Sequence, residues 1–147
     1  MLEHVCRNCA DQWLARNADR LVRGLEGGAP DSNGSYLRGC KDVGAKGHPA
    51  RFPAKLPESF IKYLTDPGDL VIDIFAGSNT TGQVAEALDR KWLAFELSRE
   101  YLATSAFRFM DNATDEELLS VHSDILANRT VDLSRFRMQL PLGTAAE

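Results

Sequence analysis

Residues 70–96 read LVIDIFAGSNTTGQVAEALDRKWLAFE, and they decide the fold of this chain. The first six are apolar except for Asp73 and predict a buried strand, which runs into a tight loop at residues 76–79. A helix is expected from residue 80 to residue 88, and residues 92–96 predict a second apolar strand. This stretch therefore predicts a βαβ unit, in which one helix joins two parallel strands of an α/β fold.

Helices are expected on both sides of this unit. Apolar residues recur at helical spacing over residues 11–25, and a loop rich in Gly, Pro, Asp, Ser and Asn follows them. Three prolines within residues 48–57 predict an extended segment. Further helices are expected at residues 36–43, just after Pro57, at residues 99–111, and at residues 114–127, where Thr114 and Glu117 predict a capping box.

The composition is that of one soluble globular domain, because 44% of the 147 residues are hydrophobic and 26% are charged. The apolar runs are far shorter than the roughly 18 residues that span a bilayer. The first residues, MLEH, do not resemble a secretory signal. We therefore expect a cytoplasmic location and no membrane contact.

The charge is unevenly distributed along the chain. The net charge of −4 does not favour nucleic acid as a partner of the whole chain. However, residues 38–62 contain six Lys and Arg against two acidic residues, whereas residues 111–124 contain acidic residues and no Lys or Arg. The basic stretch is interpreted either as a solvated face or as a surface that contacts phosphate.

Cys6, Cys9 and Cys40 are the three cysteines of the chain. An odd number without a secretion signal favours reduced thiols over disulfides. Cys6 and Cys9 form a C-x-x-C pair, but a zinc site needs a second pair, and the spacing of Cys40 and His48 does not supply one. No metal site is expected.

A candidate binding site follows from the predicted βαβ unit. Asp73 near the end of the first strand and Glu96 at the end of the second are expected side by side at the carboxyl edge of the sheet, where such folds bind ligands. A loop that contains Gly77 and opens a helix presents backbone N–H groups, and the acidic residue about 20 positions on can reach a ribose. These features favour a ligand that contains adenosine.

The loop also bears on which adenosine ligand would bind. Dinucleotide-binding loops prefer G-x-G-x-x-G, because the pyrophosphate must approach the backbone closely. Here the loop has Gly77 alone, and Gly82 already belongs to the expected helix. S-adenosylmethionine carries no phosphate, so one glycine and two carboxylates would suffice for it. On spacing alone, a strand, loop and helix without any cofactor remains equally compatible with the pattern.

Three motifs, taken together, resemble a known family. These are HPARFPAKLP at residues 48–57, DIFAGSNTTG at residues 73–82, and WLAFE at residues 92–96 with Tyr101 after it. In this order and at this separation they resemble the cofactor half of DNA methyltransferases that methylate amino groups. The SNTTG form and SAFRF at residues 105–109 most resemble the cytosine-N4 enzymes of restriction–modification systems, of the PvuII type.

The resemblance implies a fold and a domain organisation. It implies a partial Rossmann-like fold of S-adenosylmethionine-dependent methyltransferases with flanking helices. On this basis residues 1–34 are expected to form an N-terminal helix and loop, residues 35–128 the cofactor-binding half-domain, and residues 129–147 a C-terminal tail. Removing half of a two-part domain uncovers the apolar face that packed against it, so self-association is also expected.

The resemblance also implies the roles of individual residues. The segment that closes over the methionine end of the cofactor is matched by the stretch that begins at His48 and contains Phe52, Pro53 and Ala54. The loop beneath the cofactor is matched by Asp73, Phe75, Gly77, Asn79 and Thr80, and the acid that binds the ribose is matched by Glu96. Phe52 is equally compatible with a place in the apolar core.

The catalytic motif of this family, Ser-Pro-Pro-Tyr or Asp-Pro-Pro-Tyr, is absent, because none of the six prolines is adjacent to another. In this motif order catalysis and target recognition lie upstream, so no catalytic residue is assigned here. The expected function is that of the cofactor-binding half of a DNA amino-methyltransferase. It would act on DNA with a separate upstream polypeptide or a truncated upstream segment that supplies catalysis and target recognition, and the chain alone would transfer little or no methyl. The alternatives are a non-catalytic remnant or subunit and a small nucleotide-binding oxidoreductase domain.

Overall fold

The computed structural model describes residues 34–136, so the helix expected at residues 11–25 and the pair Cys6 and Cys9 lie outside the described residues. The elements in chain order are the α-helices and strands α2 (Gly34–Asp42), α3 (Lys55–Leu64), β1 (Leu70–Asp73), α4 (Thr80–Ala87), β2 (Lys91–Ala94), α5 (Arg99–Ser105) and α6 (Asp115–Leu126), with the 3-10 helices η2 (Ala106–Phe109) after α5 and η3 (Ser134–Phe136) after α6.

The predicted βαβ unit is confirmed. Strands β1 and β2 are parallel, with Leu70 opposite Lys91 and Asp73 opposite Ala94, and α4 connects them. Backbone hydrogen bonding continues past the strands, since Phe95 N donates to Asp73 O at 2.9 Å. Each strand ends two residues earlier than predicted, and Ile74, directly after β1, already belongs to a turn.

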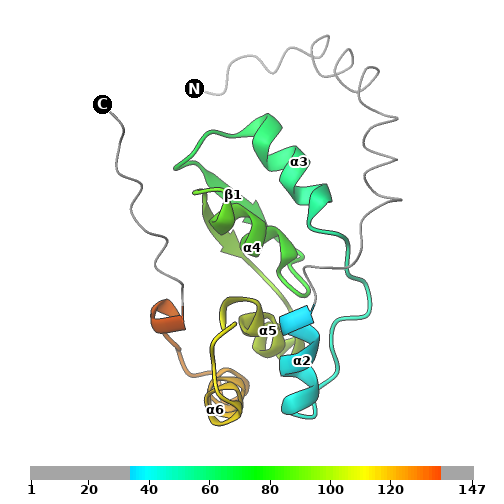
Figure 1. Cartoon of the computed structure of the whole chain (residues 1–147), viewed down its shortest axis with the longest axis vertical. Helices are drawn as coiled ribbons and strands as arrows, with labels where there is room; N and C mark the ends of the chain where they lie inside the picture. Colours follow the sequence, from blue (N-terminus) through cyan, green and yellow to red (C-terminus); the bar gives the residue numbers. More distant parts are fainter. Residues whose placement is uncertain (1–33, 137–147) are drawn as a thin grey trace.

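One face of the two strands is covered by helices. Ile61 of α3 and Val84 and Ala85 of α4 form a buried cluster, against which Val71 and Trp92 of the strands pack. In Figure 1 α4 crosses the strands and α3 lies beside them. This arrangement follows from the sequence, because alternate strand residues point to the same face of the sheet.

The opposite face of the same strands is exposed, so the prediction of a buried strand was wrong for every second residue. Leu70 is 55% exposed, Ile72 56% and Leu93 46%. Parallel sheets are normally covered on both faces, which is why continuous apolar runs predict burial. Among residues 34–136, helices cover only one face, and the other is an apolar surface.

This apolar surface is expected to drive association of the purified chain, because contiguous exposed apolar patches bind one another in water. Sedimentation velocity at high protein concentration should detect oligomers, and the double substitution Ile72→Lys with Leu93→Lys should shift the chain towards monomer. Leu119→Lys is the matched control, since Leu119 is 47% exposed on α6. A wild-type chain that stays monomeric at high concentration would contradict this expectation.

A second and larger core joins α2, η2 and α6. Its buried members are Tyr36, Cys40, Ala106, Phe107, Met110, Leu118, Val121 and Phe136. Figure 1 shows α2, α5 and α6 gathered at the opposite end of the long axis from α3. Because Phe136 of η3 is buried here, the packing of the core continues beyond residue 128, where the sequence signal fades.

Three predicted helices can be compared in detail. The helix expected after Pro57 begins earlier, at Lys55, and Pro57 is tolerated because the first helical turn has N–H groups without partners in the helix. The single helix expected over residues 99–111 instead changes to 3-10 winding at Ala106, and this turn buries both Phe107 and Arg108. The capping box of α6 is confirmed, with Thr114 and Glu117 bonded reciprocally.

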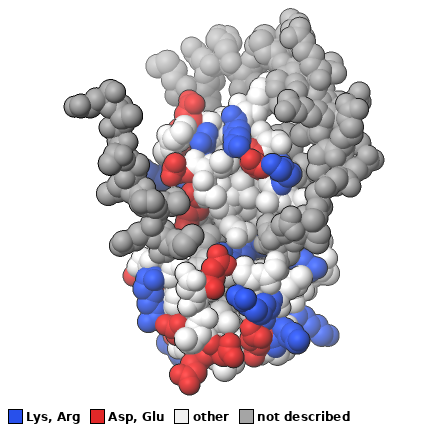
Figure 2. Space-filling model, viewed as in Figure 1, with Lys and Arg blue, Asp and Glu red and all other residues white. Residues whose placement is uncertain are grey.

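Basic and acidic side chains are interspersed on the surface. Figure 2 shows Lys and Arg side chains on both sides of the lower half, with acidic side chains between them and at its lowest part. Within residues 34–136, no helix is long and apolar enough to cross a membrane. The same residues contain no group of three His, Cys, Asp or Glu side chains placed to hold a metal ion.

Candidate functional site

The candidate site is the connection between β1 and α4, residues 74–79, which is called the Gly77 loop below. Its second half is buried, from Ala76 onward. Gly77 N donates to Oε2 of Glu96 at 2.9 Å, and Oε1 of the same carboxylate accepts from Ser98 N at 2.8 Å. Glu96 thus fastens the Gly77 loop to the segment that follows β2.

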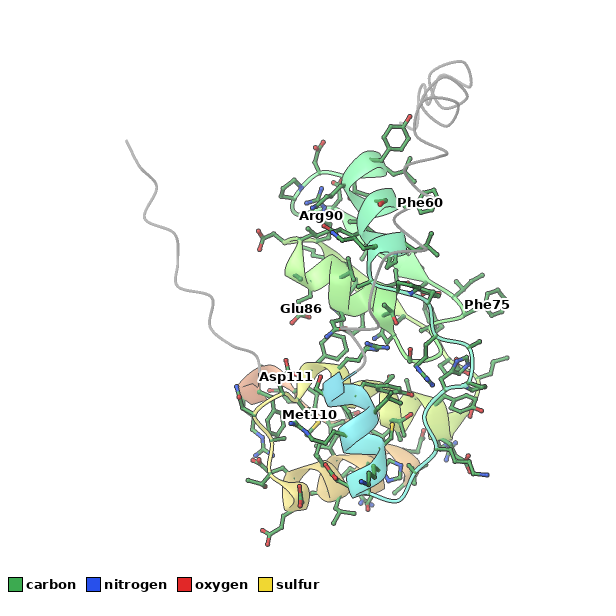
Figure 3. The ribbon with its side chains drawn as sticks, turned by 45° about the vertical axis from the view of Figure 1, so that its right-hand side comes forward. Phe60, Phe75, Glu86, Arg90, Met110 and Asp111 are labelled. Atoms are coloured by element: carbon green, nitrogen blue, oxygen red, sulfur yellow. The ribbon has the colours of Figure 1, made fainter. Side chains whose placement is uncertain are left out.

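Asp73 stands at the same edge of the sheet, at the end of β1. Its Oδ1 accepts from Phe75 N at 3.0 Å, a contact that turns the chain out of the strand. Phe75 is 79% exposed and points away from the ribbon at the edge of the view in Figure 3. The two carboxylates predicted to be neighbours therefore share an edge but bind different backbone groups, since Asp73 accepts from Phe75 N and Glu96 accepts from Gly77 N and Ser98 N.

His48 covers the glycine of the loop. Gly77 has φ +53°, and a Cβ at this position would lie 3.1 Å from Cε1 of His48. The imidazole also packs edge-to-face on Tyr101 at 4.5 Å between ring centroids. The backbone N–H of His48 donates to the hydroxyl of Tyr36 at 2.8 Å. Glycine is favoured here, because a residue with a side chain is strained at this φ and its Cβ would press on the imidazole.

The end of the Gly77 loop starts α4 through an unusual cap. Asn79 has φ 57°, in the left-handed region, and its Oδ1 accepts from Gly82 N at 3.1 Å. A Cβ on Gly82 would lie 2.3 Å from that oxygen, so the cap requires glycine at this position. Thr80 is buried, with its hydroxyl 3.3 Å from that of Ser78.

Phe52, Pro53 and Ala54 do not share these contacts. Pro53 and Ala54 form the start of α3, where their carbonyls accept from Leu56 N and Glu58 N, both at 3.0 Å. Phe52 instead lines an apolar groove of about 330 Å³ between α3, β1 and α4. Its other lining residues are Leu56, Pro57, Phe60, Ile61, Leu64, Thr65, Val71 and Thr81.

Arg108 is a residue of this site that the sequence reasoning missed. It is 2% exposed, and its Nε and Nη2 donate to the carbonyl and the hydroxyl of Ser78, the latter at 2.9 Å. Nη1 donates to Oε1 of Gln83 at 3.0 Å. Burial lowers the pKa of Arg108 to about 10, so the guanidinium stays protonated at neutral pH. The motif SAFRF pointed to this segment, but nothing in its spacing predicted that Arg108 turns inward.

Comparison with known proteins decides the family. A family model described as DNA methylase matches residues 7–107, more than half of the chain. This chain belongs to the DNA methylase family. The resemblance seen in the motifs is thereby confirmed.

Two relatives show which members of the family this chain resembles. Type II methyltransferase M.PvuII of Proteus hauseri is 57% identical over 105 residues, which are 71% of this chain and 31% of the relative. DNA adenine methyltransferase YhdJ of Escherichia coli is 46% identical over 55 residues, or 37% of this chain and 19% of the relative. The first name describes a type II enzyme and the second an adenine-specific one.

A solved structure confirms the fold. The cytosine-N4-specific PvuII DNA methyltransferase superposes with a TM-score of 0.67 and 58% identity, over 69% of this chain and 36% of that one. The chain is thus an α/β protein of the Rossmann-like methyltransferase fold, as expected. It spans about a third of the length of these two PvuII relatives. The roles assigned to single residues remain predictions.

Proposed function

We propose that this chain is the S-adenosylmethionine-binding part of a DNA amino-methyltransferase, with cytosine N4 as the favoured target. The observation that carries the proposal is the Gly77 loop, fastened through Gly77 N–H to Glu96 at the carboxyl edge of two parallel strands. Ligands of open α/β sheets bind at this edge. The relationship to a cytosine-N4-specific methyltransferase supports the choice of cofactor and target.

The hydrogen bonding of the loop favours a cofactor without phosphate. Phosphate-binding loops point several backbone N–H groups at the ligand. In the Gly77 loop, Ala76 N donates to Phe95 O, Gly77 N to Glu96, and Asn79 N to Ala76 O. These three donors already have partners inside the protein, so the loop is better suited to close approach than to holding a pyrophosphate.

Acceptors and apolar side chains suit the rest of S-adenosylmethionine. A carboxylate has about four acceptor positions, and those of Glu96 that bind neither Gly77 N nor Ser98 N can take ribose hydroxyls. Leu97, directly after Glu96, is 98% exposed, and Phe75 is 79% exposed. Both offer apolar surface for a purine ring. When bound, the cofactor supplies an electrophilic methyl group on its sulfonium.

The catalytic and DNA-reading parts are assigned to a part of the methylase that this sequence does not include. Transfer to an exocyclic amine requires the base to be taken out of the helix and held beside the methyl group. No residue of this chain is assigned to that step. We propose that the exposed strand face around Ile72 and Leu93 is the surface on which the rest of the methylase packs.

Titration of S-adenosylmethionine into the purified chain by calorimetry tests the cofactor assignment. We expect saturable binding that weakens at least about tenfold in Glu96→Ala, because hydrogen bonds to a charged group contribute about 1.5–3 kcal/mol. Asp73→Ala should weaken binding in the same direction. NAD titrated in parallel should not bind, since the loop lacks the glycines that a pyrophosphate needs.

Glu116→Ala is the matched control, because Glu116 is an exposed acidic residue in the first turn of α6. It removes the same charge and should leave the affinity unchanged. Binding of NAD in place of S-adenosylmethionine, or equal binding by Glu96→Ala and Glu116→Ala, would refute the assignment.

A further inference from the structure

We propose that Arg108 is a positioning residue for the candidate cofactor site, and that it holds the Gly77 loop in its binding shape together with Tyr36. This inference rests on the proposed function for its ligand, but it concerns residues to which that function assigned no role. Arg108 belongs to η2, Tyr36 to α2, and the loop to the βαβ unit. Three separate parts of the chain therefore meet at this loop.

Arg108 binds the loop from within the protein. Its guanidinium donates to two atoms of Ser78, the carbonyl oxygen and the hydroxyl, and a third bond goes to Gln83 in the first turns of α4. Gln83 Nε2 donates back to the Arg108 carbonyl at 3.4 Å. The planar guanidinium of Arg108 thus fixes both the last part of the loop and the start of α4, which follows it.

Tyr36 links Arg108, which binds the loop at Ser78, to His48, which covers the loop at Gly77. The Arg108 guanidinium lies over the Tyr36 ring at 4.7 Å from its centroid. The hydroxyl of the same tyrosine accepts from His48 N at 2.8 Å, and the His48 ring covers Gly77. The loop is thereby held on one side at Gly77 and on the other at Ser78, with fully buried Tyr36 joining the two contacts.

This arrangement fixes the loop before a ligand arrives. Loop ordering on binding costs affinity, and a site built with its supporting side chains already in place avoids that cost. Lysine would keep the positive charge but has no planar guanidinium to donate to Ser78 and Gln83 together. The geometry of the guanidinium, rather than its charge alone, is therefore what the site requires.

Amide hydrogen exchange in Arg108→Lys tests this inference without any ligand. We expect exchange at Gly77 N and Asn79 N to accelerate at least tenfold relative to Phe95 N, which donates to Asp73 O between the strands. Loss of the guanidinium hydrogen bonds should loosen the loop, while the amides between the paired strands stay protected from exchange. Ser78→Ala, which leaves the carbonyl acceptor of Arg108 in place and removes the hydroxyl that binds Arg108 and Thr80, should give the same pattern with a smaller acceleration.

Leu118→Ala provides the control for general destabilisation, because Leu118 is buried in α6 within the larger core. It should accelerate exchange at the loop and strand amides by the same factor. If Arg108→Lys gives that uniform pattern, or no acceleration at the loop, the inference is wrong.

Cofactor titration separates this inference from the proposed function. If the wild type binds S-adenosylmethionine, Arg108→Lys should weaken binding at least fivefold at a temperature where both are folded, and Leu118→Ala should not. Unchanged affinity in Arg108→Lys would overturn the positioning role. If the wild type does not bind, the proposed function fails, and the exchange comparison alone decides whether Arg108 holds the loop.

Discussion

Phe107→Ala is expected to lower the free energy of unfolding by about 3–5 kcal/mol, the largest stability effect of any single truncation proposed here. Phe107 is 1% exposed at the centre of the larger core, and its ring packs against the backbone of α2, where a Cβ on Gly39 would lie 3.0 Å from Cγ of Phe107. Removing the ring leaves a cavity between α2, η2 and α6. Domains of this size have about 5–15 kcal/mol of stability in total.

Urea denaturation followed by circular dichroism measures this loss. Leu119→Ala is the matched control, because Leu119 lies on α6 but is 47% exposed and should cost well under 1 kcal/mol. A loss below about 1.5 kcal/mol for Phe107→Ala would mean that the core around η2 is loosely packed. The structure predicts the opposite, since Tyr36, Cys40 and Met110 are each buried around this ring.

Gly77→Ala is expected to reduce the affinity for S-adenosylmethionine by at least about tenfold, which corresponds to about 1.4 kcal/mol. A residue with a side chain is strained at φ +53°, and its Cβ would press on the imidazole of His48. Either the loop or His48 must then move. Because Gly77 N donates to Glu96, movement of the loop also displaces the acid assigned to the ribose.

Gly44→Ala is the control that separates the effect of backbone strain from that of the contact with His48. Gly44 has φ +68°, but nothing lies within 4 Å of the position that its Cβ would take. Both substitutions should destabilise the chain by roughly 1–2 kcal/mol through the backbone, as measured by thermal unfolding. Only Gly77→Ala should weaken binding in calorimetry. Equal affinities in the two variants would show that the loop does not form the cofactor site.

The local elements of this fold could be predicted because their signals are local. Apolar periodicity located α4, and the capping box of Thr114 and Glu117 located the start of α6. The 3-10 turn at η2 could not be predicted, since it arises when Phe107 and Arg108 are both drawn into contacts with α2 and the Gly77 loop. Such contacts join residues about 30 to 70 positions apart, and no spacing within the sequence reports them.

The candidate site was predictable to a similar degree. The spacing of Gly77 and Glu96 in a βαβ unit predicted that both belong to one edge, and the structure joins them by a hydrogen bond. The contact of His48 with Gly77 was not predicted, because it joins two motifs whose residues lie 29 positions apart. Phe52, which the resemblance assigned to the cofactor and which was equally compatible with the core, is 36% exposed and lines the apolar groove beside α3, so its role stays a prediction.

The uncovered side of the two-stranded sheet has a consequence for how much of this protein a cell can maintain. A folded chain that exposes Leu70, Ile72 and Leu93 presents the kind of surface that chaperones bind and proteases reach after local opening. Whatever covers that surface stabilises the chain by mass action, in proportion to its own concentration. Under the proposal that the rest of the methylase packs on this face, copies of this chain in excess of that part are expected to be removed by quality control, and the supply of that part would set the steady-state abundance of the chain.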